Sequence, residues 1–144
     1  MKNIKKLLPM LVGAALVVFV LIQFIPYGHQ HTNPATVSEP QWSSPEARAL
    51  VKQNCFQCHS NETNWTWYSN IAPASWLIQW DVNEARQQFN FSDWNNKPGE
   101  VDEMIEEIQG GGMPPAQYTL FHPSAKLTAQ EKQDLIQALQ SSIP

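Results

Sequence analysis

The chemistry in this chain concentrates in the stretch CFQCH, which holds Cys55, Cys58 and His59. These are the only two cysteines of the chain, so a zinc site lacks the second pair of ligands that such sites usually have. A dithiol switch would require strands alternating with helices around it, and helical patterns with Trp-rich loops stand there instead. C-x-x-C-H is the pattern of covalent haem attachment. We therefore expect one haem c, held by two thioethers, with His59 as the proximal iron ligand.

A second iron ligand is expected in the loop GGGMPP, residues 110–115. Glycines let a backbone approach a porphyrin closely and prolines restrict a loop, so Met113 stands where a c-type cytochrome places its distal ligand. Met1 and Met10 belong to the N-terminal apolar region, and Met104 lies on the apolar stripe of a predicted helix. His122 is the rival ligand and would give a bis-histidine haem. An open or water-bound sixth position is the third alternative.

Aromatic residues follow the CFQCH motif closely. We expect at least one of Trp65, Trp67 and Tyr68 to contact the macrocycle, with ordinary core packing as the alternative. The ring N–H of a proximal histidine needs an acceptor. Pro73 matches the position of the backbone carbonyl, near a proline, that serves this purpose in c-type cytochromes. Arg86 is a candidate partner for a haem propionate, and an ion-paired surface arginine is the alternative.

Helical patterns must position these residues. Ser44, Pro45 and Glu46 form a helix start, which puts the cysteine pair at the C-terminal end of a short helix. Apolar residues recur at helical spacing in segments 74–89, 101–108 and 127–143, and Thr128 with Glu131 forms a capping box before the last one. We expect a small all-α, cytochrome c-like domain, in which short helices surround one covalently bound haem and the last helix packs across the first.

Five stretches carry a resemblance to a known family: CHSNET, WYSNIAP, SWLI, DVNEAR and HPSAKLT. Over about residues 27–144 the chain resembles the bacterial haem-binding domain family, a cytochrome c-like group. The resemblance implies a periplasmic, membrane-tethered domain with one haem. It implies no particular reaction, because haem binding is what defines the family.

An uncharged run of 19 residues, Leu7–Ile25, follows Lys2, Lys5 and Lys6. It is long enough to span a bilayer as a helix. A cleaved signal peptide, the alternative, would have a shorter apolar core and a small-x-small site. We expect an uncleaved transmembrane anchor at residues 1–25, an extended linker at 26–41 and the haem domain at 42–144. The positive-inside rule then predicts that Lys2, Lys5 and Lys6 stay in the cytoplasm and that the C-terminal domain lies outside it. In a bacterium the anchor would lie in the inner membrane and the haem domain in the periplasm.

Charge distinguishes the possible partners. Residues 42–144 carry six Lys or Arg against twelve Asp or Glu and show no basic stripe, which excludes nucleic-acid binding. The acidic face at Glu100–Glu107 is a candidate docking surface for a basic redox partner, or simply a solvated helix face.

Iron with His and Met ligands keeps its ligands with little rearrangement on reduction, and the Met ligand raises the reduction potential. We therefore expect an electron carrier in preference to an enzyme. The alternative is a haem-based sensor or peroxidase-type domain with a displaceable sixth ligand.

Overall fold

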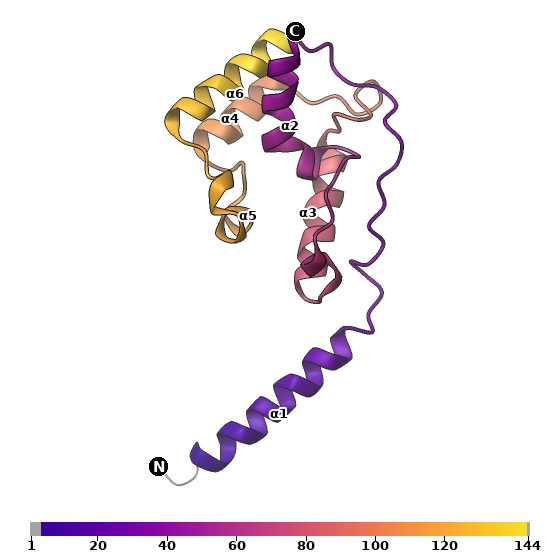
Figure 1. Ribbon diagram of the computed structural model, residues 1–144, viewed down its shortest axis with the longest axis vertical. Helices are drawn as coiled ribbons and strands as arrows, with labels where there is room; N and C mark the ends of the chain where they lie inside the picture. Colours follow the sequence, from indigo (N-terminus) through magenta and orange to yellow (C-terminus); the bar gives the residue numbers. More distant parts are fainter. Residues whose placement is uncertain (1–3, 144) are drawn as a thin grey trace. The chain divides into compact units, whose positions relative to one another are not determined.

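The computed structural model describes residues 4–143, with side chains from Leu7 onward. Its elements (Figure 1) are α1 (Ile4–Ile22), α2 (Pro45–His59), the 3₁₀ helix η1 (Trp67–Asn70), α3 (Ala74–Gln88), α4 (Val101–Gly110), α5 (Ala116–Phe121), the 3₁₀ helix η2 (Pro123–Ala125) and α6 (Ala129–Ser142). The described residues form no strand, and one isolated parallel bridge joins Ser38 to Asp93. The expected all-α fold is confirmed.

The chain divides into two compact units. Unit 1 comprises Met1–His31 and Trp65–Asp81, and unit 2 comprises Thr32–Asn64 and Val82–Pro144. Each unit is built from two stretches that lie far apart in the chain and are joined by hydrogen bonds. In unit 2, for example, the Val37 amide donates to the Ser92 carbonyl over 2.8 Å, so the expected linker is extended and is also fastened to the domain. The expected anchor, linker and haem domain stay a prediction.

Local chemistry fixes the helix ends where the sequence predicts them. The Ser44 hydroxyl accepts a hydrogen bond of 3.1 Å from the Ala47 amide and caps α2. Thr128 and Glu131 form the predicted capping box at the start of α6. Gly111 ends α4 in the left-handed conformation, with φ of +80°, a conformation that glycine adopts without a steric penalty.

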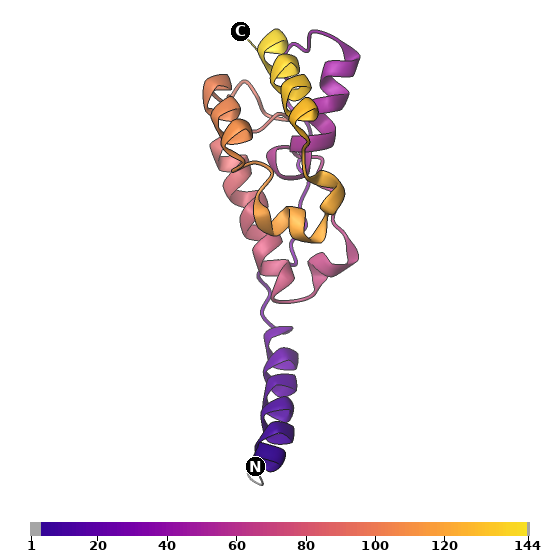
Figure 2. The same ribbon diagram turned by 90° about the vertical axis from the view of Figure 1, so that its left-hand side faces the viewer.

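The core of unit 2 lies where α6 packs against α2 and against α4 (Figures 1 and 2). This confirms the expected contact between the last helix and the helix that carries the cysteines. Met104 is buried in this core, as its place on the apolar stripe predicts. The buried members of the cluster are Val51, Phe56, Phe91, Met104, Ile108, Leu135, Ala138, Leu139 and Ile143.

Helix α1 is apolar from Leu7 onward, and its large side chains are exposed to solvent from Leu7 to Leu21. None of the helices described between residues 4 and 143 has the length and hydropathy required to cross a membrane. The structure therefore does not support the expected transmembrane helix. The side chains of Lys2, Lys5 and Lys6, on which the predicted orientation depends, lie outside the described residues.

Candidate haem-binding site

The CFQCH motif forms the last turn and a half of α2, as predicted. Cys55 and Cys58 are half-buried, and neither is in a disulfide. Burial, together with the neighbouring Cys58, raises the pKa of Cys55 to about 12. His59 is the last residue of the helix, and its side chain is buried, with 6% exposure. The three predicted attachment residues are thus brought together on one short helical segment of unit 2.

The environment of His59 keeps its imidazole neutral and fixes its orientation. Its ring stacks on the Phe89 ring, with 4.0 Å between centroids and 9° between planes. Burial lowers the pKa of His59 to about 4, a shift that the nearby backbone carbonyls of Phe89 and Ala85 partly oppose. Its Nδ1 atom is buried and has no hydrogen-bond partner of good geometry. A neutral imidazole with an unused ring nitrogen is the form that binds a metal ion.

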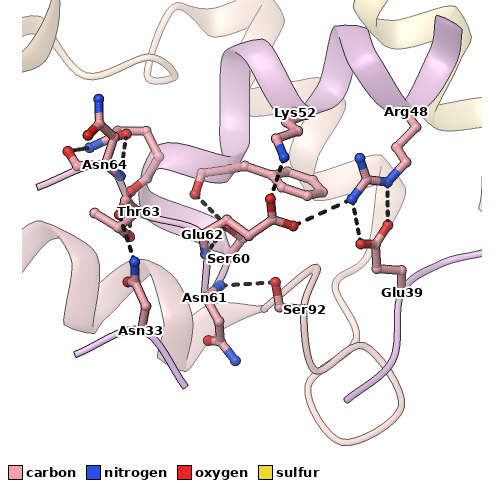
Figure 3. Close-up of polar contacts among 12 residues, drawn as sticks. Asn33, Glu39, Arg48, Lys52, Ser60, Asn61, Glu62, Thr63, Asn64 and Ser92 are labelled. Atoms are coloured by element: carbon pink, nitrogen blue, oxygen red, sulfur yellow. Dashed lines mark hydrogen bonds and ion pairs between the residues drawn. The ribbon is translucent and has the colours of Figure 1, made fainter. Parts of the chain in front are cut away.

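The backbone carbonyls at the end of α2 are satisfied from outside the helix. The Ser60 hydroxyl donates to the Phe56 carbonyl over 2.7 Å, and the Thr63 hydroxyl donates to the Gln57 carbonyl over 2.9 Å (Figure 3). The His59 carbonyl accepts from the Phe91 amide over 2.8 Å. Helix ends leave such carbonyls without intrahelical partners, so these bonds hold the motif in place.

Arg86 extends this network from α3. Its Nε donates to the Ser60 carbonyl over 2.7 Å and its Nη1 to the Thr32 carbonyl over 2.9 Å. Its Nη2 donates to Asn33 Oδ1 and to Thr63 Oγ1, both over 3.0 Å. The guanidinium is therefore held by neutral acceptors of the protein itself. A propionate contact by Arg86 stays a prediction.

A second polar group holds the residues that follow the motif. The Asn61 amide donates to the Ser92 hydroxyl over 3.0 Å (Figure 3). The Asn90 side chain donates to the Asn61 side-chain oxygen over 2.8 Å and accepts from the Ser92 amide over 2.9 Å. Sequence reasoning did not assign these residues a role. The polar run SNET, directly after the motif, could have indicated these contacts, because buried polar side chains need hydrogen-bond partners.

An ion-pair network lies on the outer face of α2 (Figure 3). Arg48 binds Glu39 through Nε and Nη2, over 2.7 Å and 2.6 Å, and lies 3.4 Å from Glu62. Lys52 also pairs with Glu62. Trp42 Nε1 donates to Glu39 over 2.7 Å. The network ties the segment before α2 and the loop after it to the helix that carries the haem motif.

Met113 lies in the short turn between α4 and α5 and is half-buried. Its amide donates to the Glu107 carbonyl over 3.2 Å, and the Gly112 amide donates to the same carbonyl over 2.9 Å. Both bonds follow the glycine ending of α4, so this turn is fixed to the helix. Met113 belongs to unit 2, as do the cysteines and His59. Its role as axial ligand stays a prediction.

His122, the rival ligand, ends α5 in the same unit. Its ring stacks on Tyr118 with 4.3 Å between centroids, and its Nδ1 lies 3.1 Å from the Tyr118 carbonyl. Figures 1 and 2 show α5 and the C-terminal end of α2 on the same side of α6.

The predicted aromatic contacts belong to unit 1. The Trp65 ring stacks on His31 with 4.5 Å between centroids. Trp67 packs edge-on against Tyr68, with 5.6 Å between centroids, and its side chain is 75% exposed. Trp65 and Tyr68 are half-buried. Contact between any of these rings and a haem stays a prediction.

Pro73 is the residue whose predicted environment changes most. The predicted role of Pro73 requires that its carbonyl can accept a hydrogen bond from the ring N–H of His59. In the structure this carbonyl accepts from the Trp76 amide over 3.1 Å and from the Leu77 amide over 3.3 Å, at the start of α3. The carbonyls that lie near the His59 ring are those of Phe89 and Ala85.

The acidic face of α4 is exposed, as expected from its pattern. Its exposed carboxylates are Glu100, Asp102, Glu103, Glu106 and Glu107. The part of the chain that the structure describes contains no group of three or more His, Cys, Asp or Glu placed to share a metal ion.

The residues at the end of α2 fit a haem. Two cysteines at C-x-x-C spacing, neither in a disulfide, precede a buried, neutral histidine whose Nδ1 lacks a partner. Comparison with curated proteins and with solved structures gives no significant match. The family model of the haem-binding domain matches residues 17–141, which include the motif, both candidate sixth ligands, nearly all of unit 2 and the part of unit 1 from Val17 onward. The chain therefore belongs to the haem-binding domain family.

Proposed function

We propose that this chain is a membrane-tethered, periplasmic c-type monohaem protein that carries electrons. The observation that carries the proposal is the last turn of α2, where Cys55 and Cys58 precede a buried His59 that stacks on Phe89. Cys55 and Cys58 would hold the haem through thioethers, and His59 would bind its iron. The haem supplies reversible one-electron chemistry.

The chain's own residues set the conditions for that chemistry. Phe89 restricts the rotation of the His59 ring, and the lowered pKa keeps the ring nitrogen available to iron at neutral pH. The ring N–H of an iron-bound histidine needs an acceptor. We assign this task to the carbonyl of Phe89 or Ala85, because these are the backbone carbonyls that lie near the His59 ring.

Met113 is the proposed sixth ligand. Its turn is held by two hydrogen bonds to Glu107, so the thioether is presented on a fixed segment. A thioether is a soft ligand that favours ferrous iron and raises the reduction potential. A six-coordinate iron of this kind suits electron transfer.

The tether and the location follow from the sequence alone. Leu7–Ile25 contains no charged residue, and α1 exposes large apolar side chains that water solvates poorly. Attachment of haem c takes place outside the cytoplasm, which agrees with a periplasmic domain. The exposed carboxylates of α4 offer a docking surface for a basic redox partner.

Covalent haem attachment is the first test. The full chain, expressed with a cytochrome c maturation system, should carry haem that survives a denaturing gel. Replacing both Cys55 and Cys58 with Ala should remove this label. A control that replaces Met10 with Ala should keep it. Covalent haem on the double variant, or no covalent haem on the unaltered chain, would overturn the proposal.

A further inference from the structure

The stretch that follows α1 is fastened to the stretch around η1. The Gln23 side chain donates to the Ala72 carbonyl over 3.0 Å and accepts from the Ala72 amide over 2.9 Å. Gly28, at φ of +85°, lies so close to Ser75 that an added Cβ would be 2.6 Å from the Ser75 carbonyl oxygen. Segment 23–28 is therefore no free spacer within unit 1.

His31 provides a third point of attachment. Its ring stacks on Trp65, and its Nε2 lies 2.8 Å from the Ser69 carbonyl. With the contacts of Gln23 and Gly28, this holds the stretch that leaves α1 against η1 and the start of α3. The exposed side chains of these elements thus lie at the same end of unit 1 as the end of α1.

Beyond its first six residues, which include Lys2, Lys5 and Lys6, unit 1 is almost without charge. From Leu7 onward, its two segments contain a single charged side chain, that of Asp81, whereas every arginine of the chain belongs to unit 2. It also exposes large apolar side chains beyond α1 itself. These are Phe24 (79%), Ile25 (43%), Tyr27 (45%), Trp67 (75%), Leu77 (41%) and Trp80 (54%).

We propose that unit 1 rests on the headgroup region of the bilayer that holds α1, with Trp67, Leu77 and Trp80 in contact with lipid. The inference rests on the proposed tether and names a second contact with the membrane. Tryptophan and tyrosine concentrate at membrane interfaces, because one end of each ring is apolar and the other donates a hydrogen bond. A surface with almost no charge makes this contact without desolvating ionic groups.

The face of α3 that carries this contact is defined by helical spacing. Leu77 and Trp80 are separated by three positions and share one exposed face. Ser75 and Gln79 are buried on another face of the same helical stretch. Because no lysine or arginine takes part, the contact should form on neutral lipids and should not weaken with salt.

Photo-crosslinking in nanodiscs of neutral phosphatidylcholine tests the contact on the full haem-loaded chain. The crosslinker p-benzoylphenylalanine replaces Leu16 in α1, Trp67, Trp80 or Glu103 on the acidic face of α4, one position at a time. All four side chains are exposed, so folding should survive each replacement. We expect lipid adducts at positions 16, 67 and 80 and none at 103.

The positions separate the two proposals. Adducts at 16 with none at 67 and 80 would overturn the surface contact and leave the tether standing. No adducts at 16 would overturn the tether, and the surface contact with it. If lipid adducts were as frequent at position 103 as at position 67, the crosslinker would be capturing lipid without a specific contact. That result would also overturn the proposed contact of unit 1 with the bilayer. The haem absorption spectrum of the variant at position 80 should match that of the unaltered chain, since lipid is the proposed neighbour of Trp80.

Discussion

Arg86 Nε donates a hydrogen bond to the Ser60 carbonyl over 2.7 Å, one residue beyond the histidine that we assign to iron. The same guanidinium reaches Thr63, whose hydroxyl caps the Gln57 carbonyl inside the CFQCH motif. One side chain of α3 thus fixes both the motif and the turn that follows it.

Replacing Arg86 with Ala should destabilise the protein strongly. The change leaves the Ser60 and Thr32 carbonyls without their donor, and a hydrogen bond to a charged group contributes about 1.5–3 kcal/mol. We expect a loss of roughly 3 kcal/mol in the free energy of unfolding, measured by chemical denaturation. Arg86→Lys should recover only part of it, because an ammonium lacks the planar fork.

Arg48→Ala is the matched control for Arg86. Arg48 is also an arginine of unit 2 with hydrogen-bonded partners, but it lies in a surface ion pair, whose loss costs about 0–1 kcal/mol. A different result would contradict the structural role of Arg86. If Arg86→Ala left the free energy of unfolding unchanged but shifted the reduction potential, Arg86 would act on a haem propionate.

Phe89→Leu tests how the His59 ring is oriented. The stacked aromatic ring restricts rotation of the imidazole, and a branched aliphatic side chain does not. We expect altered g values in the electron paramagnetic resonance spectrum of the ferric protein, with covalent haem retained and about 1 kcal/mol of stability lost. Phe121→Leu, on a ring that is 73% exposed, should change neither the g values nor the free energy of unfolding. Identical g values in the Phe89 variant would show that the stack does not orient the ligand.

The ion pair of Glu39 predicts a dependence of stability on pH. The hydrogen bond from Arg48 lowers the pKa of the Glu39 carboxyl in the folded protein. The ionised Glu39 carboxyl therefore stabilises the folded protein fully at pH values above its pKa in the unfolded chain, about 4.3. This stabilisation is lost as the pH falls through the lower pKa of Glu39 in the folded protein. Glu39→Gln should be less stable at neutral pH, by less than about 1 kcal/mol, and equally stable well below pH 3.

Denaturation curves at a series of pH values measure this difference. Glu106→Gln, on the exposed face of α4, is the control, because its carboxylate is exposed and takes no part in the ion-pair network around Arg48. A gap between Glu39→Gln and the unaltered chain that stayed constant down to low pH would show that the charge of Glu39 is not the cause.

Sequence reasoning succeeded where the causes are local. The caps at Ser44 and Thr128 depend on residues within one turn, and the apolar stripe with Met104 depends on helical spacing. Both can therefore be predicted from short stretches. The same holds for the position of His59 at the end of its helix.

Long-range polar contacts could not be predicted in this way. The bond from Asn33 to the Thr63 carbonyl and the pairing of Gln23 with Ala72 join residues that no periodicity relates. For that reason the contacts of the extended linker could not be predicted. The Pro73 carbonyl is a different case, because its acceptor capacity is used locally, in the first turn of α3. A polar side chain of unknown partner is compatible with many topologies, whereas an apolar stripe has only one buried side.

The identity of the sixth ligand decides the function. If Met113 binds iron, the protein should be low-spin in both oxidation states, and its ferric form should show the weak red-edge absorption band of an iron–thioether bond. Met113→Ala should remove this band and lower the reduction potential, because a soft ligand that favours ferrous iron is lost. The open position should then bind carbon monoxide or cyanide. Absorption spectra and potentiometric titration of the haem-loaded chain measure each effect.

Two variants separate Met113 from the alternatives. Met104→Ala should keep the spectrum and cost only core stability, roughly 2–5 kcal/mol, since Met104 is buried between α4 and its neighbours. His122→Ala tests the rival: if it converts the spectrum and Met113→Ala does not, the haem has two histidine ligands. In that case the stack on Tyr118 and the contact of Nδ1 with the Tyr118 carbonyl orient the second ligand. If the unaltered protein is high-spin and binds carbon monoxide readily, neither residue closes the sixth position, and a sensor or peroxidase replaces the electron carrier.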